Sequence, residues 1–247
     1  MRTVVVIQAR MNSKRLPGKV LKNIRKKPML WHIVDRIKDS KFIDDIVIST
    51  TKEKTDDAIE EFANSNQFMI YRCVGDVNDL INRLYYPSKI FNADVVVRLW
   101  GDCPLVYYQI INELLERFIE EKYDFANNYV DATGFNFEIY TFKTLKTIWK
   151  SSEPFYRRFP REYVYDHKDL FNIYTGEKKL KDICLTVDYP EDFDLITDIF
   201  DEQTRQNETF DIDDIKDYLQ KFPDERSKTL ERNIEYKEEL KKRSVKE

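Results

Sequence analysis

The feature that most constrains the fold is an alternation of strand-like and helix-like segments through the first half of the chain. Short runs rich in Val and Ile predict strands, and apolar residues that recur every three or four positions predict amphipathic helices. This alternation is typical of α/β proteins with right-handed crossovers, so we predict a doubly wound, mostly parallel sheet. The expected segments are a strand at 4–7, a helix at 28–38, a strand at 45–50, a helix at 54–64, a strand at 68–72, a helix at 76–90, a strand at 93–99 and a helix at 107–121.

The predicted topology also indicates where a ligand binds. In doubly wound sheets, ligands lie outside the carboxyl ends of the strands, at the point where the strand order reverses. If the first four strands have the order 3-2-1-4, the loop after the first strand and Asp102 after the fourth flank the same crevice. Residues far apart in the sequence would then form one site.

The loop after the first strand is unusually cationic. Arg10, Lys14, Arg15 and Lys19 stand within ten residues, and Pro17–Gly18 turns the chain. Cations crowded at one strand end repel one another unless an anion joins them, and a polyphosphate supplies several negative oxygens. The alternative is a solvated surface turn, but the position at a strand end favours a phosphate site.

The second half of the chain has a less regular pattern. We expect a loop around 127–134, then an aromatic and basic stretch at 155–163 that is either an acceptor-binding or dimerisation arm or a peripheral helix. The domain prediction is a main domain at 1–222, containing an inserted arm at 128–175, followed by a charged tail at 223–247. The other expected segments are a strand at 138–141, a helix at 142–151, strands at 171–175 and 183–187, a helix beginning at Pro190 and a short helix at 212–219.

Composition excludes several classes of protein. The chain has 247 residues and a formal net charge of −4, which argues against a nucleic-acid-binding protein. Its three cysteines are widely spaced and suggest neither disulfides nor a zinc site. No apolar run is long enough to predict a membrane span or a signal peptide, so we expect a cytoplasmic protein. The glycine motifs of dinucleotide-binding and P-loop proteins are also missing.

Several charged residues have two possible roles at this stage. Asp188 stands between a predicted strand and a helix start, where it is equally suited to cap the helix or to bind a metal. Arg98 interrupts a valine-rich strand and needs an anionic partner, either Asp102 or a substrate. Asp79 and Arg83 are four residues apart on a predicted helix, so they form a surface ion pair or lie near a nucleotide.

Three motifs occur together in the order 8–19, 101–105 and 185–193: QARMNSKRLPGK, GDCPL and LTVDYPEDF. In order and spacing they resemble the cytidylyltransferase family that includes CMP-Kdo synthetase and CMP-acylneuraminate synthetase. The likeness is greatest to the branch of spore coat polysaccharide biosynthesis protein F. The resemblance implies a fold like that of nucleotide-diphospho-sugar transferases and transfer of CMP from CTP to an acceptor oxygen, with release of pyrophosphate.

The resemblance also implies roles for individual residues. The cationic loop would hold the triphosphate, two aspartates would bind Mg²⁺, and the family's dimerisation implies a homodimer. Phosphate oxygens with one or two carboxylates suit Mg²⁺, and phosphoryl chemistry depends mainly on positioning and charge neutralisation. The residues assigned in this way are Arg10, Ser13, Arg15 and Lys19 for the triphosphate, Asp102 and Asp188 for Mg²⁺, Arg72, Asp79 and Arg83 near the nucleotide, and Glu138, Arg161 and Glu162 for the acceptor. Arg10, Arg15, Lys19 and Asp102 are the expected catalytic residues, and Gln8, Ala9 and Arg98 are further expected substrate-binding residues.

The acceptor is expected to be small and anionic. A sugar acid is the first choice, and a phosphorylated polyol or a phosphonate is the next, for surface-glycan or related biosynthesis. Neither His32 nor His167 stands out as a general base, which favours an acceptor oxygen that is charged or metal-activated. The alternatives are a glycosyltransferase that uses a nucleotide sugar and a non-catalytic nucleotide-binding protein. Asp102 is followed by Cys103 and not by the Asp-x-Asp motif of glycosyltransferases.

Overall fold

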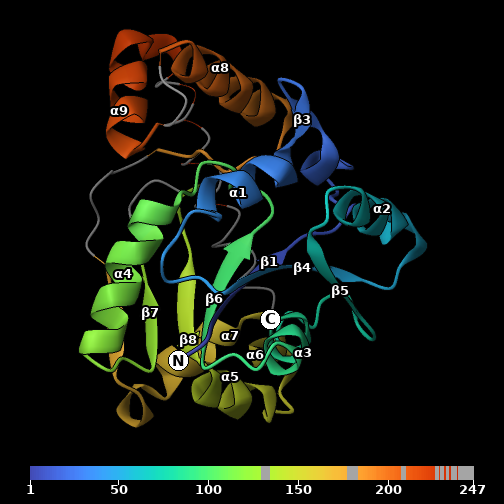
Figure 1. The fold of residues 1–247 in the computed structure, drawn as a ribbon, viewed down its shortest axis with the longest axis vertical. Helices are drawn as coiled ribbons and strands as arrows, with labels where there is room; N and C mark the ends of the chain where they lie inside the picture. The colour runs from blue at the N-terminus through green and yellow to red at the C-terminus, as the bar shows by residue number, and fades with distance from the viewer. Residues whose placement is uncertain are drawn as a thin grey trace.

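The computed structural model describes residues 1–128, 134–176, 183–206 and 210–225, together with residues 228, 231, 234 and 238. The first half of the chain contains the predicted alternation of strands and helices (Figure 1). Its elements are β1 (Thr3–Gln8), η1 (Lys19–Leu21), β2 (Asn23–Ile24), β3 (Lys27–Pro28), α1 (Met29–Ile37), β4 (Asp45–Thr51), η2 (Lys54–Asp56), α2 (Asp57–Ser65), β5 (Met69–Cys73), α3 (Asn82–Ile90), β6 (Val95–Trp100) and α4 (Tyr108–Glu120).

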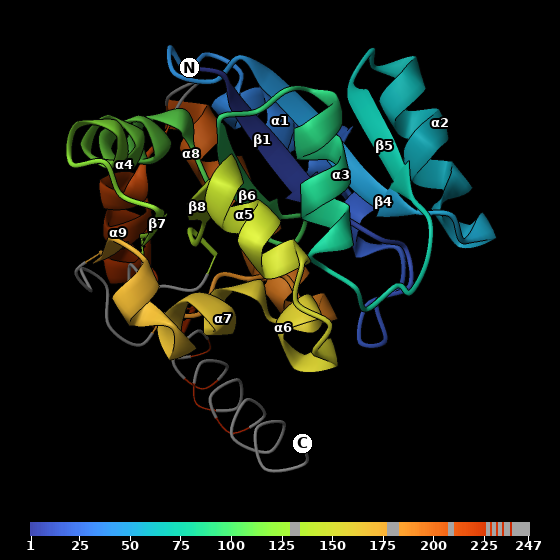
Figure 2. The same cartoon turned by 90° about the horizontal axis from the view of Figure 1, so that it is seen from below.

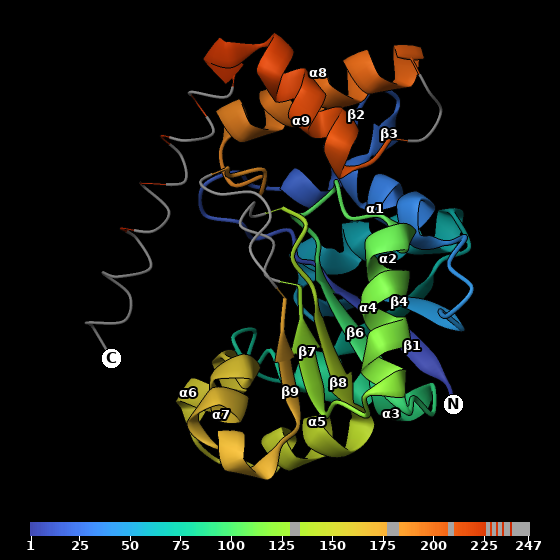
Figure 3. The same ribbon diagram turned by 90° about the vertical axis from the view of Figure 1, so that its left-hand side faces the viewer.

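The second half adds three short strands to the sheet and several helices around it. Figure 3 shows α8 and α9 side by side at one end of the molecule, near α1 and the β2–β3 hairpin, and α5 to α7 at the opposite end. The elements are β7 (Phe125–Asn127), β8 (Glu138–Thr141), α5 (Phe142–Trp149), α6 (Pro154–Arg158), α7 (Pro160–Asp166), η3 (Lys168–Leu170), β9 (Ile173–Thr175), α8 (Pro190–Gln206) and α9 (Ile212–Lys221).

The main sheet has seven strands in the order β5-β4-β1-β6-β8-β7-β9. The pairs β1–β4, β1–β6 and β4–β5 are parallel, so the predicted order 3-2-1-4 of the first four long strands is confirmed. β8 is antiparallel to β6 and places Glu138 directly opposite Arg98. The fold is therefore α/β with a mostly parallel sheet, as expected.

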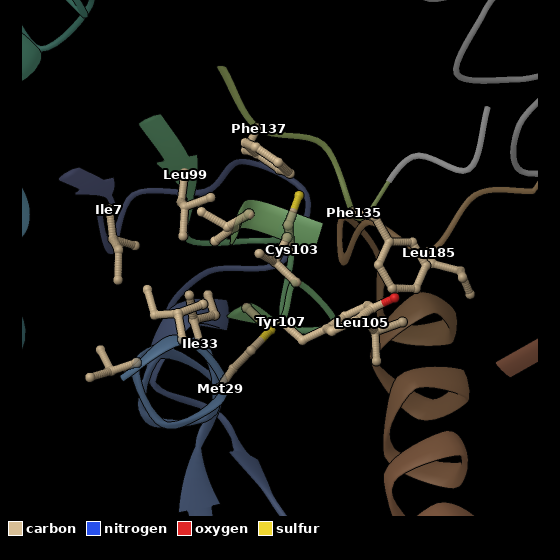
Figure 4. Close-up of a cluster of buried hydrophobic side chains, with 14 of the residues drawn as sticks. Ile7, Met29, Ile33, Leu99, Cys103, Leu105, Tyr107, Phe135, Phe137 and Leu185 are labelled. Atoms are coloured by element: carbon tan, nitrogen blue, oxygen red, sulfur yellow. The ribbon is translucent and has the colours of Figure 1, made fainter. Parts of the chain in front are cut away.

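The two faces of the sheet carry separate hydrophobic clusters because side chains alternate along each strand. Val5 and Ile7 of β1 pack toward α1, α2 and α4, whereas Val4 and Val6 pack toward α3 and α5. Figure 2 shows α3 and α5 crossing this second face. The first cluster extends to the segment before α8, where Leu185 lies near the others (Figure 4). Both faces are thus covered, as a parallel sheet requires.

Several predicted elements differ from the structure. The helix expected at 76–90 begins at Asn82, because the Asp79 side chain accepts the Asn82 N–H at 3.0 Å and ends a turn there. The strand expected at 183–187 has a single bridge at Cys184, although its Val187 N–H donates to the Asp102 carbonyl at 2.9 Å. β7 (Phe125–Asn127) forms where no element was expected, and its last residue overlaps the loop expected around 127–134. Residues 129–133 of the expected loop, and most of the predicted tail, lie outside the described residues.

None of the described helices has the length and the apolar character that a bilayer span requires. Within the predicted arm at 128–175, β8 and β9 are strands of the main sheet. The helices α6 and α7 of this arm lie outside the sheet, and they contain most of the aromatic and basic stretch.

Candidate active site

A cavity of about 1130 Å³ opens beyond the carboxyl ends of β1 and β6. The loop after β1 forms one wall, and Gly101–Asp102 after β6 forms another. Asp188 before α8 and Arg158–Phe159 between α6 and α7 complete it. The prediction that the cationic loop and Asp102 flank one crevice is therefore confirmed. In the following text, this cavity is called the cleft.

The buried carboxylate of Asp56 holds the beginning of the cationic loop. Its Oδ1 accepts the Met11 N–H at 2.8 Å, and its Oδ2 accepts the Thr50 hydroxyl at 2.8 Å and the Thr51 N–H at 3.1 Å. Burial by itself would raise the pKa of Asp56, but the hydrogen bonds from Met11, Thr51 and Thr50 outweigh it and lower the pKa. The carboxylate stays charged and fixes the loop to β4.

The loop then turns back on itself through Gly18. Gly18 has a φ of 71°, in the left-handed region that favours glycine, and its N–H donates to the Met11 carbonyl at 2.9 Å. The next residue, Lys19, starts η1 and points its buried side chain into the base of the cleft. Lys14, by contrast, remains exposed at the rim.

Lys19 joins the two aspartates of the second and third sequence motifs. Its Nζ donates to Asp102 Oδ2 at 2.9 Å, to Asp188 Oδ1 at 2.9 Å and to the Val187 carbonyl at 2.6 Å. Arg15 Nη2 also lies 2.7 Å from Asp188 Oδ1. Burial opposes the charge of Lys19, but the attraction of Asp102 and Asp188 is stronger and raises the pKa of the ammonium. The three motifs therefore meet in one ionic cluster.

Asp188 is not the residue that caps α8 in this structure. The Asp192 side chain accepts the N–H groups of Asp188 and Tyr189 at the start of the helix. The carboxylate of Asp188 faces Lys19 and Arg15. The Asp188 carboxylate therefore does not cap the helix, and its position suits the binding of a cation.

Arg83 is a buried cation at the opposite side of the cleft. Its side chain lines the cleft although the residue is 4% exposed, and its Nε is buried without a hydrogen-bond partner in the part of the chain that the structure describes. Its Nη2 donates to the Val77 carbonyl at 3.3 Å. Burial, together with the nearby charges of Arg10 and Arg98, lowers the pKa of Arg83 to about 10. A largely buried cation with no carboxylate partner among the described residues is costly, so an acceptor group of a ligand in the cleft would stabilise it.

A sequence profile of the cytidylyltransferases matches residues 4–243, which is nearly the whole chain. The chain belongs to the cytidylyltransferase family. The resemblance that the three motifs indicated is thereby confirmed, and the enzyme is a CTP-using nucleotidyltransferase. This excludes the non-catalytic alternative and favours nucleotidyl transfer over glycosyl transfer.

Three known proteins show how widely the likeness extends. An uncharacterized protein of Methanocaldococcus jannaschii is 33% identical over 242 residues, which are 96% of this chain and 97% of that protein. Spore coat polysaccharide biosynthesis protein SpsF of Bacillus subtilis is 26% identical over 205 residues, 79% of this chain and 85% of SpsF. A cytidylyltransferase from Leptospira borgpetersenii whose structure is known is 30% identical in sequence to this chain. The two structures align with a TM-score of 0.83 over 92% of this chain and 97% of that chain.

In this cytidylyltransferase, Arg98 is paired with a residue of the protein and not with Asp102. Its Nη1 lies 3.0 Å from Glu138 Oε2, and its Nε donates to Gln8 Oε1 at 3.0 Å. The Gln8 amide in turn donates to the Leu80 carbonyl at 2.8 Å. The expectation that Asp102 is the protein partner of Arg98 is wrong, because Glu138 stands opposite Arg98 in the sheet register. This network joins β6 and β8 to the wall of the cleft.

The predicted site residues divide into two groups. The predicted residues outside the cleft form ion pairs with other residues of the protein. Arg72 pairs with Asp57 and Glu60, and Arg161 pairs with Glu162. Asp79 pairs with Arg157 at 2.7 Å, so its expected ion pair with Arg83 is wrong. The predicted residues that line the cleft are Gln8, Ala9, Arg10, Ser13, Arg15, Lys19, Asp102 and Asp188, and those that do not are Arg72, Asp79, Arg98, Glu138, Arg161 and Glu162.

The donor set at Asp102 and Asp188 fits a nucleotide-bound Mg²⁺. Among the described residues, no cluster of three or more His, Cys, Asp or Glu side chains is suited to bind a metal alone. Two carboxylates beside a cationic phosphate loop match the preference of Mg²⁺ for one or two carboxylates with phosphate oxygens and water. The residues therefore suit a metal that arrives with a triphosphate.

Sequence reasoning missed three residues that shape the cleft: Asp56, Trp100 and Arg158. Arg83, for which a place near a nucleotide was one of two expectations, lines the cleft. Asp56 lies in a predicted helix with ordinary surface spacing, and nothing in the pattern separates it from the exposed Asp57. Trp100 immediately precedes Gly101–Asp102, so its place beside a motif is the signal that could have identified it. For Arg158, the aromatic and basic stretch indicated a ligand-binding arm without selecting the residue.

Proposed function

We propose that this cytidylyltransferase transfers CMP from CTP, with Mg²⁺, to a small anionic acceptor and releases pyrophosphate. The leading acceptor class is a sugar acid, followed by a phosphorylated polyol or a phosphonate, for surface-glycan or related biosynthesis. The observation that carries the proposal is the meeting of Lys19, Asp102 and Asp188 at the base of a cleft whose rim is the cationic loop.

The cationic loop is the proposed site of the triphosphate. Arg10, Lys14 and Arg15 line the cleft on the same loop as Ser13, whose hydroxyl accepts the Leu16 N–H at 3.4 Å. Cations fixed in this way neutralise the charge that develops on the pyrophosphate leaving group. Because Asp56 and Gly18 hold the loop in shape, little reorganisation is needed when the nucleotide binds.

Asp102 and Asp188 would hold Mg²⁺ beside these phosphates. When bound, the metal would supply further charge neutralisation and help to orient the reacting phosphoryl group. The carboxylates come from the end of β6 and from the segment before α8, and the Val187–Asp102 backbone hydrogen bond keeps the two segments together. Both carboxylates thus already lie together, on either side of the Lys19 ammonium, before the nucleotide arrives.

Arg83 is the proposed partner of the nucleotide at the other side of the cleft. Its guanidinium side chain lines the cleft, and cytosine presents two adjacent acceptors, the O2 oxygen and N3. Uracil has a donor at N3, so the same guanidinium would leave it mismatched. This arrangement supports the cytosine preference that family membership implies.

The acceptor side of the cleft is formed by Arg158 and Phe159. Neither histidine of the chain lines the cleft: His32 contacts the Ile24 carbonyl and His167 the Tyr163 carbonyl. The cleft does contain carboxylates, which could accept the proton of a sugar-acid hydroxyl, whereas a phosphate or phosphonate oxygen is already charged. A cation on this wall is suited to an anionic acceptor.

The proposal is tested with purified protein, CTP, Mg²⁺ and a panel of sugar acids, phosphorylated polyols and phosphonates, by following pyrophosphate release. One class of acceptor should give turnover that requires metal. Asp102→Asn should abolish turnover while CTP binding, measured by calorimetry, is partly kept. Asp217→Asn, which changes an exposed aspartate of α9, is the control. Silence across the panel together with no CTP binding would contradict the proposal, and full activity of Asp102→Asn would refute the metal site.

The homodimer through residues 138–171 and the cytoplasmic location remain predictions. Analytical ultracentrifugation of the protein tests the first, and fractionation of the cells that produce it tests the second.

A further inference from the structure

The ammonium group of Lys19 has no donor left for a ligand. An ammonium carries three protons, and Nζ has three acceptors: Asp102 Oδ2 at 2.9 Å, Asp188 Oδ1 at 2.9 Å and the Val187 carbonyl at 2.6 Å. The side chain is 8% exposed. In this arrangement, Lys19 cannot also bind a phosphate oxygen, which is the role that the family resemblance implies for it.

The same contacts affect the proposed metal ligands. Nζ lies 2.9 Å from Asp102 Oδ2 and 2.9 Å from Asp188 Oδ1, so the ammonium already lies between the two carboxylates. Magnesium requires oxygen ligands at about 2.0–2.1 Å, closer than an ammonium approaches an oxygen. A divalent cation centred between the two carboxylates would take the position of the ammonium, and one bound at their other oxygens would be repelled by the ammonium charge a few ångströms away.

The charges of the cluster are balanced without a metal. Lys19 and Arg15 contribute two positive charges, and Asp102 and Asp188 contribute two negative ones. Removing Lys19 from a largely buried position would leave carboxylates without enough counter-charge, which is unfavourable unless another cation replaces it. The Lys19 ammonium and a divalent cation therefore compete for the position between the two carboxylates.

We propose that Lys19 is the internal counter-ion of the two aspartates in the nucleotide-free enzyme, and that it competes with a divalent cation for their carboxylates. Lys19 leaves the aspartates when metal and nucleotide arrive together, and its ammonium then becomes available to the triphosphate. This inference depends on the proposed function for the identity of the ligands. It implies that metal binds weakly without nucleotide, because the ammonium must first be displaced.

The test measures Mn²⁺ binding to the nucleotide-free protein by electron paramagnetic resonance of the unbound ion. Lys19→Met removes the competing charge and keeps the length of the side chain. It should bind Mn²⁺ tighter than the wild type by on the order of tenfold or more, because a charge a few ångströms from the ligands is lost. Lys22→Met is the matched control, since it removes the same charge from an exposed position three residues further along the chain, outside the cleft, and should leave Mn²⁺ affinity within about twofold.

A double variant, Lys19→Met with Asp102→Asn, shows where the additional Mn²⁺ affinity arises. If the tighter binding occurs between the aspartates, the double variant should lose it. Unchanged or weaker Mn²⁺ binding by Lys19→Met would overturn the inference, and so would a gain that survives in the double variant. Circular dichroism confirms that each variant is folded, and Lys19→Gln replaces Lys19→Met if the latter is not.

This experiment needs neither CTP nor an acceptor, so it separates the two proposals. A gain in Mn²⁺ affinity in an enzyme that shows no turnover with any acceptor would support the ammonium competition and contradict the acceptor assignment. Turnover without a gain in Mn²⁺ affinity would support the acceptor assignment and contradict the ammonium competition.

Discussion

The carboxylate of Asp192 accepts the backbone N–H groups of Asp188 and Tyr189, at 2.9 and 2.8 Å. Asp192 is the third residue of α8, and its side chain reaches back to the backbone just before the helix, as the acidic residue of a capping box does. The carboxylate of Asp188 meets Lys19 and Arg15 instead. One aspartate positions the backbone so that the other can serve the site.

Replacing Asp192 by Ala should reduce both stability and turnover. Loss of the two hydrogen bonds to the Asp192 carboxylate costs about 1.5–3 kcal/mol of the free energy of unfolding. Turnover should fall by more than this loss explains, because the backbone that aims Asp188 at the cleft is no longer held. Urea denaturation and pyrophosphate release provide the two measurements. Asp194→Ala, an exposed aspartate on the same helix, is the control, and wild-type turnover of Asp192→Ala would disprove the positioning role.

Arg83 and Arg98 should respond in opposite ways to the same change. Arg83→Met removes a buried charge that has no carboxylate partner among the described residues, so stability should be unchanged or increased. CTP affinity should fall by about tenfold or more, as expected for loss of hydrogen bonds from a charged donor. Arg98→Met breaks the buried pair with Glu138 and should destabilise by about 3–5 kcal/mol.

Thermal unfolding and calorimetry with CTP distinguish these outcomes. Wild-type CTP affinity in Arg83→Met would show that the guanidinium does not contact the nucleotide. A large loss of stability in the same variant would show that its charge is satisfied within the protein.

Asp56→Asn should weaken CTP binding by loosening the cationic loop. An amide cannot accept from all the donors that surround this carboxylate, and one N–H or hydroxyl is left unpaired, at about 1–3 kcal/mol of stability. The Met11 N–H is then less well held, so the loop must be ordered when the nucleotide binds. Asp57→Asn changes the adjacent exposed aspartate, which contacts Arg72 outside the cleft, and should have little effect on CTP affinity. Equal CTP affinities in the two variants would show that Asp56 does not hold the cationic loop for CTP binding.

His32 should make stability fall in mildly acidic solution. Burial lowers the pKa of His32, although a hydrogen bond from its Nε2 to the Ile24 carbonyl partly opposes this effect. The folded pKa lies below the unfolded value of about 6.5. The unfolded chain therefore binds a proton first, and stability present above that pH is lost as the pH falls through 6.5 toward the folded pKa.

The measurement compares urea denaturation of the wild type and of His32→Gln at several pH values on both sides of about 6.5. The glutamine amide can still donate to the Ile24 carbonyl but cannot take up a proton. The difference in stability between the two proteins should change over this range in favour of the variant as the pH falls. A constant difference would show that His32 does not contribute.

The periodic pattern of the sequence was sufficient to predict the layered fold. Val4 to Ile7 alternate between two hydrophobic clusters, and the alternation of strands and helices predicts right-handed crossovers that cover both faces of a parallel sheet. The strand order 3-2-1-4 was one of the doubly wound orders that this pattern allows, and the structure has it. The pattern failed where a side chain competes with the backbone periodicity. Asp79 accepts the Asn82 N–H and delays the start of α3, which apolar spacing does not reveal.

The sequence by itself determined that a cationic loop follows the first strand and that an aspartate follows the fourth, because both depend on local order along the chain. The tertiary structure decided which charges meet. Glu138 lies opposite Arg98 through the sheet register, and Lys19 lies between Asp102 and Asp188 through the packing of three distant segments. Ion pairing depends on distances of a few ångströms between such segments, and sequence spacing does not specify those distances.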